Sequence, residues 1–192
     1  AVKYGIGYLS EDRRRYGVVV QKSVNENTTL ATMEEFTNGI FINKAKEKEV
    51  SERYVKELAT KTPSGDQLVV NLSGGNQQKV VIAKWLTRDS DILIFDEPTR
   101  GIDVGAKYEI YRLIFQLADE GRGVIVISSE LPELLGICDR IYTICEGKIT
   151  GVTNAKTTNQ EELMKLMTLT SSTTHSSSAP QGDNVPTGAA AH

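Results

Sequence analysis

The amino-acid sequence predicts an α/β protein built on a parallel sheet. Two runs of consecutive apolar residues, 92–95 and 124–127, are typical of strands that are buried on both faces. The segment between them, about residues 104–119, carries apolar side chains at helical spacing. A strand, a helix and a second strand in this order form a βαβ unit with parallel strands and a right-handed crossover.

The N-terminal third predicts one strand followed by helices. Residues 6–9 are expected to form a short strand that ends at the charged cluster 11–15. The three arginines of that cluster are expected to be solvated or at an interface. Residues 23–27 are suited to cap a helix, and residues 28–61 are expected to be helical and to lie on the surface, because oppositely charged side chains recur four residues apart.

The C-terminal half predicts a buried helix, the βαβ unit, a hairpin and a polar tail. After a break at residues 62–66, the helix that follows Gly75 is apolar almost all round and should be buried. Residues 140–150 are expected to form a β-hairpin with a glycine turn, and residues 161–167 a last helix. From residue 168 onward the Ser-, Thr-, Ala- and Gly-rich composition predicts a disordered tail.

The composition is that of an ordinary globular protein, with 39% hydrophobic and 24% charged residues. The formal net charge of −3 gives no reason to expect binding to nucleic acid or to an anionic membrane surface. No apolar run is long enough to span a bilayer. Cys138 and Cys145 lie in or beside apolar segments, so buried thiols are expected rather than a disulfide or a metal site.

Two stretches carry candidate chemistry. Asp96 and Glu97 end an apolar run, where paired carboxylates can hold Mg²⁺ and orient a water molecule. Ser73-Gly74-Gly75 forms a flexible turn that leads into a helix, so its backbone N–H groups can cradle a phosphate. An acidic pair in this position often only caps the following helix, so the pair taken alone leaves both interpretations open. Together the two stretches indicate nucleoside triphosphate chemistry.

The order and spacing of these residues resemble the ATP-binding cassette (ABC) ATPases over roughly residues 4–167. Residues 72–77 look like the signature motif of that family, and residues 91–96 look like its Walker B strand. Glu97 then falls at the position of the catalytic glutamate, and residues 101–103 look like the D-loop. The resemblance implies a P-loop NTPase-like nucleotide-binding domain with parallel core strands, flanking helices, a helical subdomain and a C-terminal β-hairpin.

A narrower resemblance is to the second cassette of the tandem ATPase subunits of bacterial ribose, galactose and xylose importers. Residues 8–13 resemble its Q-loop, with Glu11 where most cassettes have glutamine. Residues 76–79, 98–107 and 128–133 resemble that cassette as well. The resemblance implies ATP binding and hydrolysis coupled to the import of a monosaccharide by an ABC transporter.

The resemblance gives each candidate residue a role, with ATP and Mg²⁺ as cofactors. Asp96 would hold Mg²⁺, usually through a water molecule, and Glu97 would act as general base. Glu11 would occupy the Q-loop position, and Asp103 would report across the interface between two cassettes. The signature residues would contact an ATP molecule bound by the opposite cassette; they are Leu72, Ser73, Gly74, Gly75, Asn76 and Gln77.

The same resemblance implies partners at the cytoplasmic face of the bacterial cell membrane. The direct partners would be an N-terminal ATPase cassette of the same protein, or a second copy, and the membrane permease subunits. A periplasmic sugar-binding protein would act indirectly, and no nucleic acid is expected. Two alternatives stay open, a non-catalytic regulatory or interaction half-cassette and a soluble ABC ATPase of translation or DNA repair.

Two departures from the family pattern bear on catalysis. The sequence contains no Gly-x-x-x-x-Gly-Lys-Ser/Thr phosphate loop, so we expect a truncated cassette that is inactive when isolated. Ser129 stands at the position of the switch histidine, and a serine lacks the charge and donor character of imidazole. The second cassette of such importers commonly lacks this histidine, so Ser129 fits the resemblance.

The sequence divides into four expected segments. Residues 1–27 hold a core strand and the Q-loop-like segment, and residues 28–71 form a helical subdomain. Residues 72–167 carry the signature helix, the Walker B strand, the D-loop and the switch region, and residues 168–192 form the tail.

Overall fold

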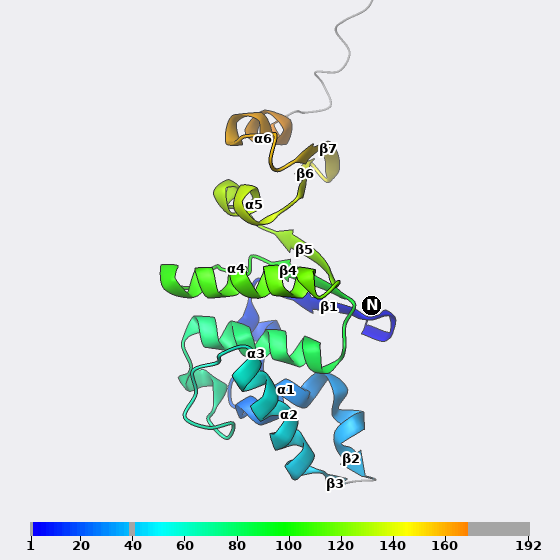
Figure 1. The fold of residues 1–192 in the computed structure, drawn as a ribbon, viewed down its shortest axis with the longest axis vertical. Helices are drawn as coiled ribbons and strands as arrows, with labels where there is room; N and C mark the ends of the chain where they lie inside the picture. Colours follow the sequence, from blue (N-terminus) through cyan, green and yellow to red (C-terminus); the bar gives the residue numbers. More distant parts are fainter. Residues whose placement is uncertain (1, 39–40, 169–192) are drawn as a thin grey trace, which may run out of the picture. The chain divides into compact units, whose positions relative to one another are not determined.

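A computed structural model describes residues 2–38 and 41–168 (Figure 1). The contacts divide the chain into two units, Ala1–Cys138 and Asp139–His192. This boundary lies inside the expected segment 72–167. Residues 169–192, where the sequence predicts a disordered tail, lie outside the described residues.

A three-stranded parallel sheet forms the centre of the first unit. Strand β4 (Ile92–Asp96) lies between β1 (Ile6–Leu9) and β5 (Gly123–Ile127) and pairs in parallel with both. Helix α4 (Val104–Asp119) connects β4 to β5 within the bounds that the periodicity predicts. The βαβ unit and the α/β fold class are therefore confirmed.

One face of this sheet is packed against helices. Leu9, Leu93 and Phe95 are fully buried in the main hydrophobic cluster, and helix α3 (Gly74–Thr87) contacts β1 and α4 (Figure 1). Helix α3 is buried almost all round, as predicted, because its apolar residues meet both the sheet and the small helices of the N-terminal part.

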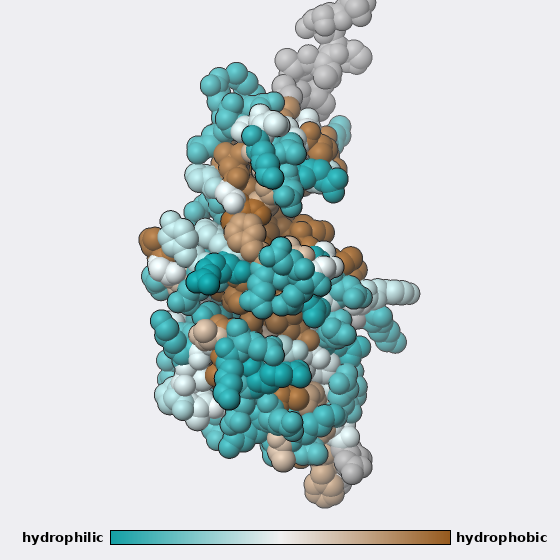
Figure 2. Space-filling view, viewed as in Figure 1, coloured by the Kyte–Doolittle hydropathy of each residue, from teal (hydrophilic) through white to brown (hydrophobic). Residues whose placement is uncertain are grey.

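The other face of the sheet is open among the described residues. Ile125 and Ile127 of β5 are 51% and 49% exposed, and Figure 2 shows hydrophobic surface around that strand. The expectation that residues 92–95 and 124–127 are buried on both faces is therefore wrong for the structure as described. Consecutive apolar residues indicate a buried strand, but they do not show which segment of the chain covers each face.

The region expected to be helical, residues 28–61, is interrupted. It contains the end of α1 (Val24–Thr29), a 3₁₀ segment (Leu30–Phe36), a small antiparallel hairpin of β2 (Thr37–Asn38) and β3 (Phe41–Ile42), and α2 (Lys44–Glu57). The chain kinks at Thr32, whose φ of −132° and ψ of 30° are not helical. Asn43 then caps α2 through a bond from the Lys46 N–H to its side chain.

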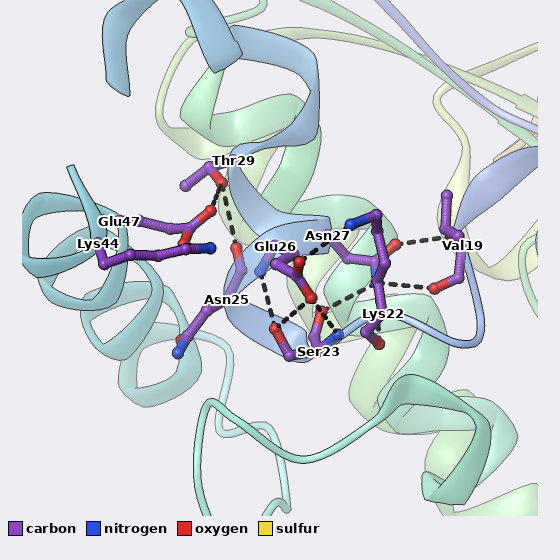
Figure 3. Close-up of polar contacts among 9 residues, drawn as sticks. All are labelled: Val19, Lys22, Ser23, Asn25, Glu26, Asn27, Thr29, Lys44 and Glu47. Carbon is purple, nitrogen blue, oxygen red and sulfur yellow. Dashed lines mark hydrogen bonds and ion pairs between the residues drawn. The ribbon is translucent and has the colours of Figure 1, made fainter. Parts of the chain in front are cut away.

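Polar side chains fix the start of α1 (Figure 3). Ser23 and Glu26 form a capping box, in which each side chain bonds to the backbone N–H of the other residue. Asn27 is fully buried and binds the backbone of Val19 and Ser23. These contacts fasten α1 to the segment that comes from β1. The expected helix cap within residues 23–27 is confirmed at Ser23, but the helix begins at Val24 and not near residue 28.

None of the described helices is long and apolar enough to cross a membrane. Short elements complete the first unit. A five-residue π-helix (Arg13–Gly17) follows β1, and α5 (Leu131–Ile137) follows β5. The remaining short elements are 3₁₀ turns at Val2–Tyr4 and Val69–Asn71.

The second unit is a hairpin followed by a helix. Strands β6 (Arg140–Cys145) and β7 (Lys148–Asn154) are antiparallel, and Glu146 and Gly147 between them have φ values of 49° and 75°. Two central residues with positive φ are typical of a tight hairpin turn. Helix α6 (Gln160–Met167) follows, so the predicted hairpin and last helix are both confirmed.

The two cysteines lie nearer the surface than the sequence indicates. Cys138 directly follows α5 and Cys145 precedes the hairpin turn, and both are half-buried. An apolar neighbourhood in sequence therefore did not place them in a core.

Candidate functional site

The carboxyl end of β4 holds the first group of candidate residues. Asp96 is the last residue of this central strand, and Tyr8 of the neighbouring strand β1 donates its hydroxyl to Asp96 Oδ2 at 2.5 Å. This hydrogen bond, together with burial and the charge of Asp96, raises the pKa of Tyr8. Asp96 Oδ1 accepts no bond from the described residues, so it is available to a ligand.

Glu97 follows in a strained backbone conformation. Its φ of 47° lies in the left-handed region, which is uncommon for a non-glycine residue. Two hydrogen bonds hold it against the end of β5, one from its own N–H to Ile127 O and one from the Ser129 N–H to its Oε1, both at 2.8 Å. The structure thus brings Glu97 and Ser129 together.

The hydrogen bond from Ser129 to Glu97 forms although position 129 has no histidine side chain. The donor is the backbone N–H, so the contact does not depend on the side chain at this position. Any residue except proline can supply it. Ser129 therefore retains one means of orienting Glu97, although its side chain cannot carry the charge of a histidine.

The turn at the start of α3 holds the second group. Ser73 precedes the helix with extended backbone and makes no side-chain cap bond, and its Oγ accepts from Asn76 Nδ2 at 2.9 Å. A Cβ on Gly74 would lie 3.1 Å from Gly101 O, and one on Gly75 would lie 2.8 Å from the Ala106 Cβ. Glycine is required here because the turn packs directly against the segment that follows β4.

The remaining signature residues are less accessible than the resemblance implies. Leu72 is half-buried, and Gln77 is only 3% exposed. Gln77 donates its Nε2 to the carbonyls of Val69 and Leu72, both at 3.1 Å. In this structure Gln77 supports the turn from inside, and a direct contact of Gln77 with nucleotide stays a prediction.

The segment after β1 is tied to the turn after β4. Glu11 at the Q-loop position forms an ion pair with Arg100, and Arg13 Nη1 donates to Arg100 O at 2.9 Å. Arg13 is half-buried rather than solvated, and burial lowers its pKa, with the charge of Arg14 adding to the effect. The sequence therefore did not distinguish Arg13, which has a structural contact, from the exposed Arg14 and Arg15.

Asp103 lies at the start of α4. It is exposed and caps the helix by accepting from the Ala106 N–H at 3.0 Å. A cap is the ordinary role of an aspartate in this position, and a contact across an interface between cassettes stays a prediction.

The candidate residues form two groups, not one. Among the described residues, no hydrogen bond or ion pair joins the Ser73 turn to Asp96, Glu97 or Ser129. Nor do those residues contain a cluster of three or more His, Cys, Asp or Glu side chains able to hold a metal ion. Mg²⁺ is often held in proteins by one or two carboxylates, with water and substrate phosphates completing its shell, so Asp96 alone fits such an ion.

Sequence reasoning missed two residues of the first group. Tyr8 could have been found from strand register, because it pairs with Ile94, two residues before Asp96. Glu133 is a buried carboxylate that accepts from Thr99 Oγ1 at 2.8 Å, and its sequence position on a short helix gives no sign of this.

Comparison with known proteins places this arrangement in context. Residues 5–100 match the family described as ABC transporter. The L-arabinose transport ATP-binding protein AraG of Geobacillus stearothermophilus is 52% identical over 170 residues, which cover 88% of this chain and 33% of that protein. The xylose import ATP-binding protein XylG of Thermoanaerobacter pseudethanolicus is 56% identical over 164 residues, or 85% of this chain and 32% of that protein. The chain thus spans about a third of the length of the curated relatives it matches.

Solved structures share the fold. A dimeric ATP-binding cassette in a post-hydrolysis state, bound to ADP and Pi, has a TM-score of 0.65 at 19% identity and covers 78% of this chain and 62% of its own. The ADP conformation of an ATP-binding cassette of an ABC transporter has a TM-score of 0.64 at 22% identity, with coverage of 85% and 65%. At these identities the likeness shows the fold alone, and that fold is the one the sequence predicts.

Proposed function

This chain belongs to the ABC transporter family, and from that membership we propose that it is part of an ATP-hydrolysing subunit that drives import of a monosaccharide across a membrane. The relatives named above, which transport L-arabinose or import xylose, support this choice at 52% and 56% identity. Its partners would be a second cassette and membrane permease subunits, and a periplasmic sugar-binding protein would act indirectly. The chain would then work at the cytoplasmic face of the membrane without entering it.

The observation that carries the proposal is the hydrogen-bonded position of Glu97 beside Asp96. Asp96 would hold Mg²⁺ through Oδ1, because Oδ2 is engaged by Tyr8. When bound, Mg²⁺ neutralises charge on the β- and γ-phosphates of ATP. Glu97 would accept a proton from the attacking water through Oε2, because Oε1 is engaged by the Ser129 N–H.

The Ser73 turn would serve a different ATP molecule, bound by the partner cassette. The first N–H groups of α3 have no partner within the helix, and the helix dipole favours a negative charge there. Ser73 Oγ accepts from Asn76, which leaves its own hydroxyl proton to donate to a phosphate oxygen. The two groups of residues would thus be halves of two ATP sites.

We expect the 192-residue chain alone to have negligible ATPase activity and weak nucleotide binding, because its sequence lacks the phosphate-loop motif. The measurement is phosphate release by the purified chain with ATP and Mg²⁺. Robust Mg²⁺-dependent turnover would contradict the proposal that this chain carries only part of each site.

Glu97→Gln in the full-length protein tests the proposed base. The amide can still accept the Ser129 bond but cannot take a proton, and a general base contributes about 10²–10⁴-fold at its own site. Glu130→Gln is the matched control, since Glu130 is a nearby exposed carboxylate that, among the described residues, pairs with Lys107. A fall in turnover for the first variant and not the second supports catalysis by Glu97.

A second candidate function is a regulatory half-cassette that binds nucleotide without hydrolysing it. The serine side chain at the switch position favours this candidate, because it cannot supply positive charge near the γ-phosphate. An unchanged rate for Glu97→Gln would select it. A soluble ABC ATPase of translation or DNA repair is a third, and co-purification with a polytopic membrane subunit would exclude it.

A further inference from the structure

Glu133 is a buried carboxylate held by hydroxyl groups from other elements. It lies in α5 and is 5% exposed. One oxygen accepts from Thr99 Oγ1, in the turn after β4, at 2.8 Å, and the other accepts from Ser128 Oγ, in the loop after β5. A buried charge is strongly destabilising unless it is hydrogen-bonded or paired, and these hydroxyls satisfy both oxygens.

A third hydroxyl approaches from α4. Tyr111 is half-buried, and its pKa is raised by that burial, by the charge of Glu133 and by a hydrogen bond to Glu133. The nearby ammonium of Lys107 adds positive charge. The carboxylate therefore joins the turn after β4, helix α4 and the loop after β5 at a single point.

This junction lies next to both sides of the Glu97 contact. Thr99 lies two residues after Glu97, and Ser128 immediately precedes Ser129, whose N–H binds Glu97 Oε1. Resting on the function proposed above, we propose that Glu133 is a positioning residue that holds Glu97 where it can act on water. Glu133 itself touches neither water nor nucleotide in this role.

The length and acceptor geometry of the side chain matter. Each oxygen of Glu133 has its own donor, so an aspartate, shorter by one methylene, loses at least one of the two contacts. A glutamine keeps the length. Its carbonyl can accept from Thr99, and its amide can donate to Ser128 Oγ, which already accepts from the Glu130 N–H.

The experiment compares Glu133→Asp, Glu133→Ala and Glu133→Gln in the full-length protein. A misplacement of about 1 Å costs up to about 10²-fold in rate, so we expect kcat to fall about tenfold or more for Asp and Ala. We expect KM for ATP to stay within about twofold, because binding of substrate is not altered. Gln should keep at least about half of the activity, and Glu130→Gln should behave as the unaltered protein.

Hydrogen exchange at the Ser129 amide gives a second readout that does not depend on turnover. Exchange should accelerate in Glu133→Asp and Glu133→Ala, and it should stay slow in Glu97→Gln, whose amide oxygen can still accept the Ser129 bond. Unchanged kcat, a change confined to KM, or unchanged Ser129 exchange in a folded Asp or Ala variant would overturn the role of Glu133.

The two proposals fail in different ways. If Glu97→Gln leaves turnover unchanged, catalysis at this site is excluded, and the exchange of Ser129 then decides alone whether Glu133 orders the loop. If Glu97→Gln lowers turnover while Glu133→Asp does not, the proposed function stands and the positioning role of Glu133 is wrong.

Discussion

Replacing Asn27 with alanine is expected to lower the free energy of unfolding by about 3 kcal/mol. Asn27 is fully buried, and its side chain joins α1 to the segment before it (Figure 3). Its Oδ1 accepts from the Val19 N–H at 2.8 Å, and its Nδ2 donates to the carbonyls of Val19 and Ser23 at 3.0 and 2.9 Å. A contact of 3.3 Å with Lys22 O shares the same two amide hydrogens.

The estimate combines about 2 kcal/mol for the Val19 N–H, which loses its acceptor, with about 0.5 kcal/mol for each of the two bonds to carbonyls. The two main acceptors keep a second donor after the substitution, because the Lys22 N–H bonds to Val19 O and the Asn27 N–H bonds to Ser23 O. The Val19 N–H has no other partner among the described residues, and leaving a donor unsatisfied costs about 1–3 kcal/mol. Most of the loss should therefore come from that one group.

The assay is urea unfolding of the chain followed by far-UV circular dichroism, with Asn25→Ala as the control. Asn25 lies in the same helix and is also buried, but it makes one side-chain bond, to Asp66 at 3.1 Å, and its Oδ1 is buried without a partner. Its removal should cost about 1 kcal/mol or less. Equal losses for the two variants would refute the account based on hydrogen bonds.

Two further predictions concern pH. Bonds from the Ser23 N–H and from Lys22 lower the pKa of Glu26 to about 2. The contribution of Glu26 to stability should therefore be complete above its ordinary pKa of 4.5 and lost as the pH falls towards 2. Unfolding of Glu26→Gln measured against pH should lack that loss, and a parallel loss in both proteins would contradict the prediction. Burial lowers the pKa of Lys84 from 10.5 to about 8, so the folded state releases this proton first and stability should rise between pH 8 and 10.5 by up to about 1.4 kcal/mol per pH unit. Lys84→Met should remove the rise, and an unchanged slope would show that the desolvation argument is wrong.

Local patterns predicted the elements whose structure depends on local sequence. The bounds of α4 and the β6–β7 hairpin follow from the periodicity and from the turn at Glu146 and Gly147. The expectation of continuous helix over residues 28–61 was wrong, because the chain kinks at the buried Thr32, where tertiary packing overrides helix propensity. A new helix then begins after Asn43, whose side chain caps it through the Lys46 N–H, a local signal that the sequence carries. A weakly amphipathic, charge-rich segment is where such an override is most effective.

The sequence by itself determined the family resemblance, the parallel β4–β5 unit and the position of Asp96 and Glu97 at the end of a strand. Only the tertiary structure decided how these residues are held. Tyr8 and Asp96, which form a hydrogen bond, are 88 positions apart in the sequence. Thr99 and Glu133, which also form a hydrogen bond, are 34 positions apart. A hydrogen bond of this kind depends on where two distant segments meet, and a pattern along one segment contains no information about the other.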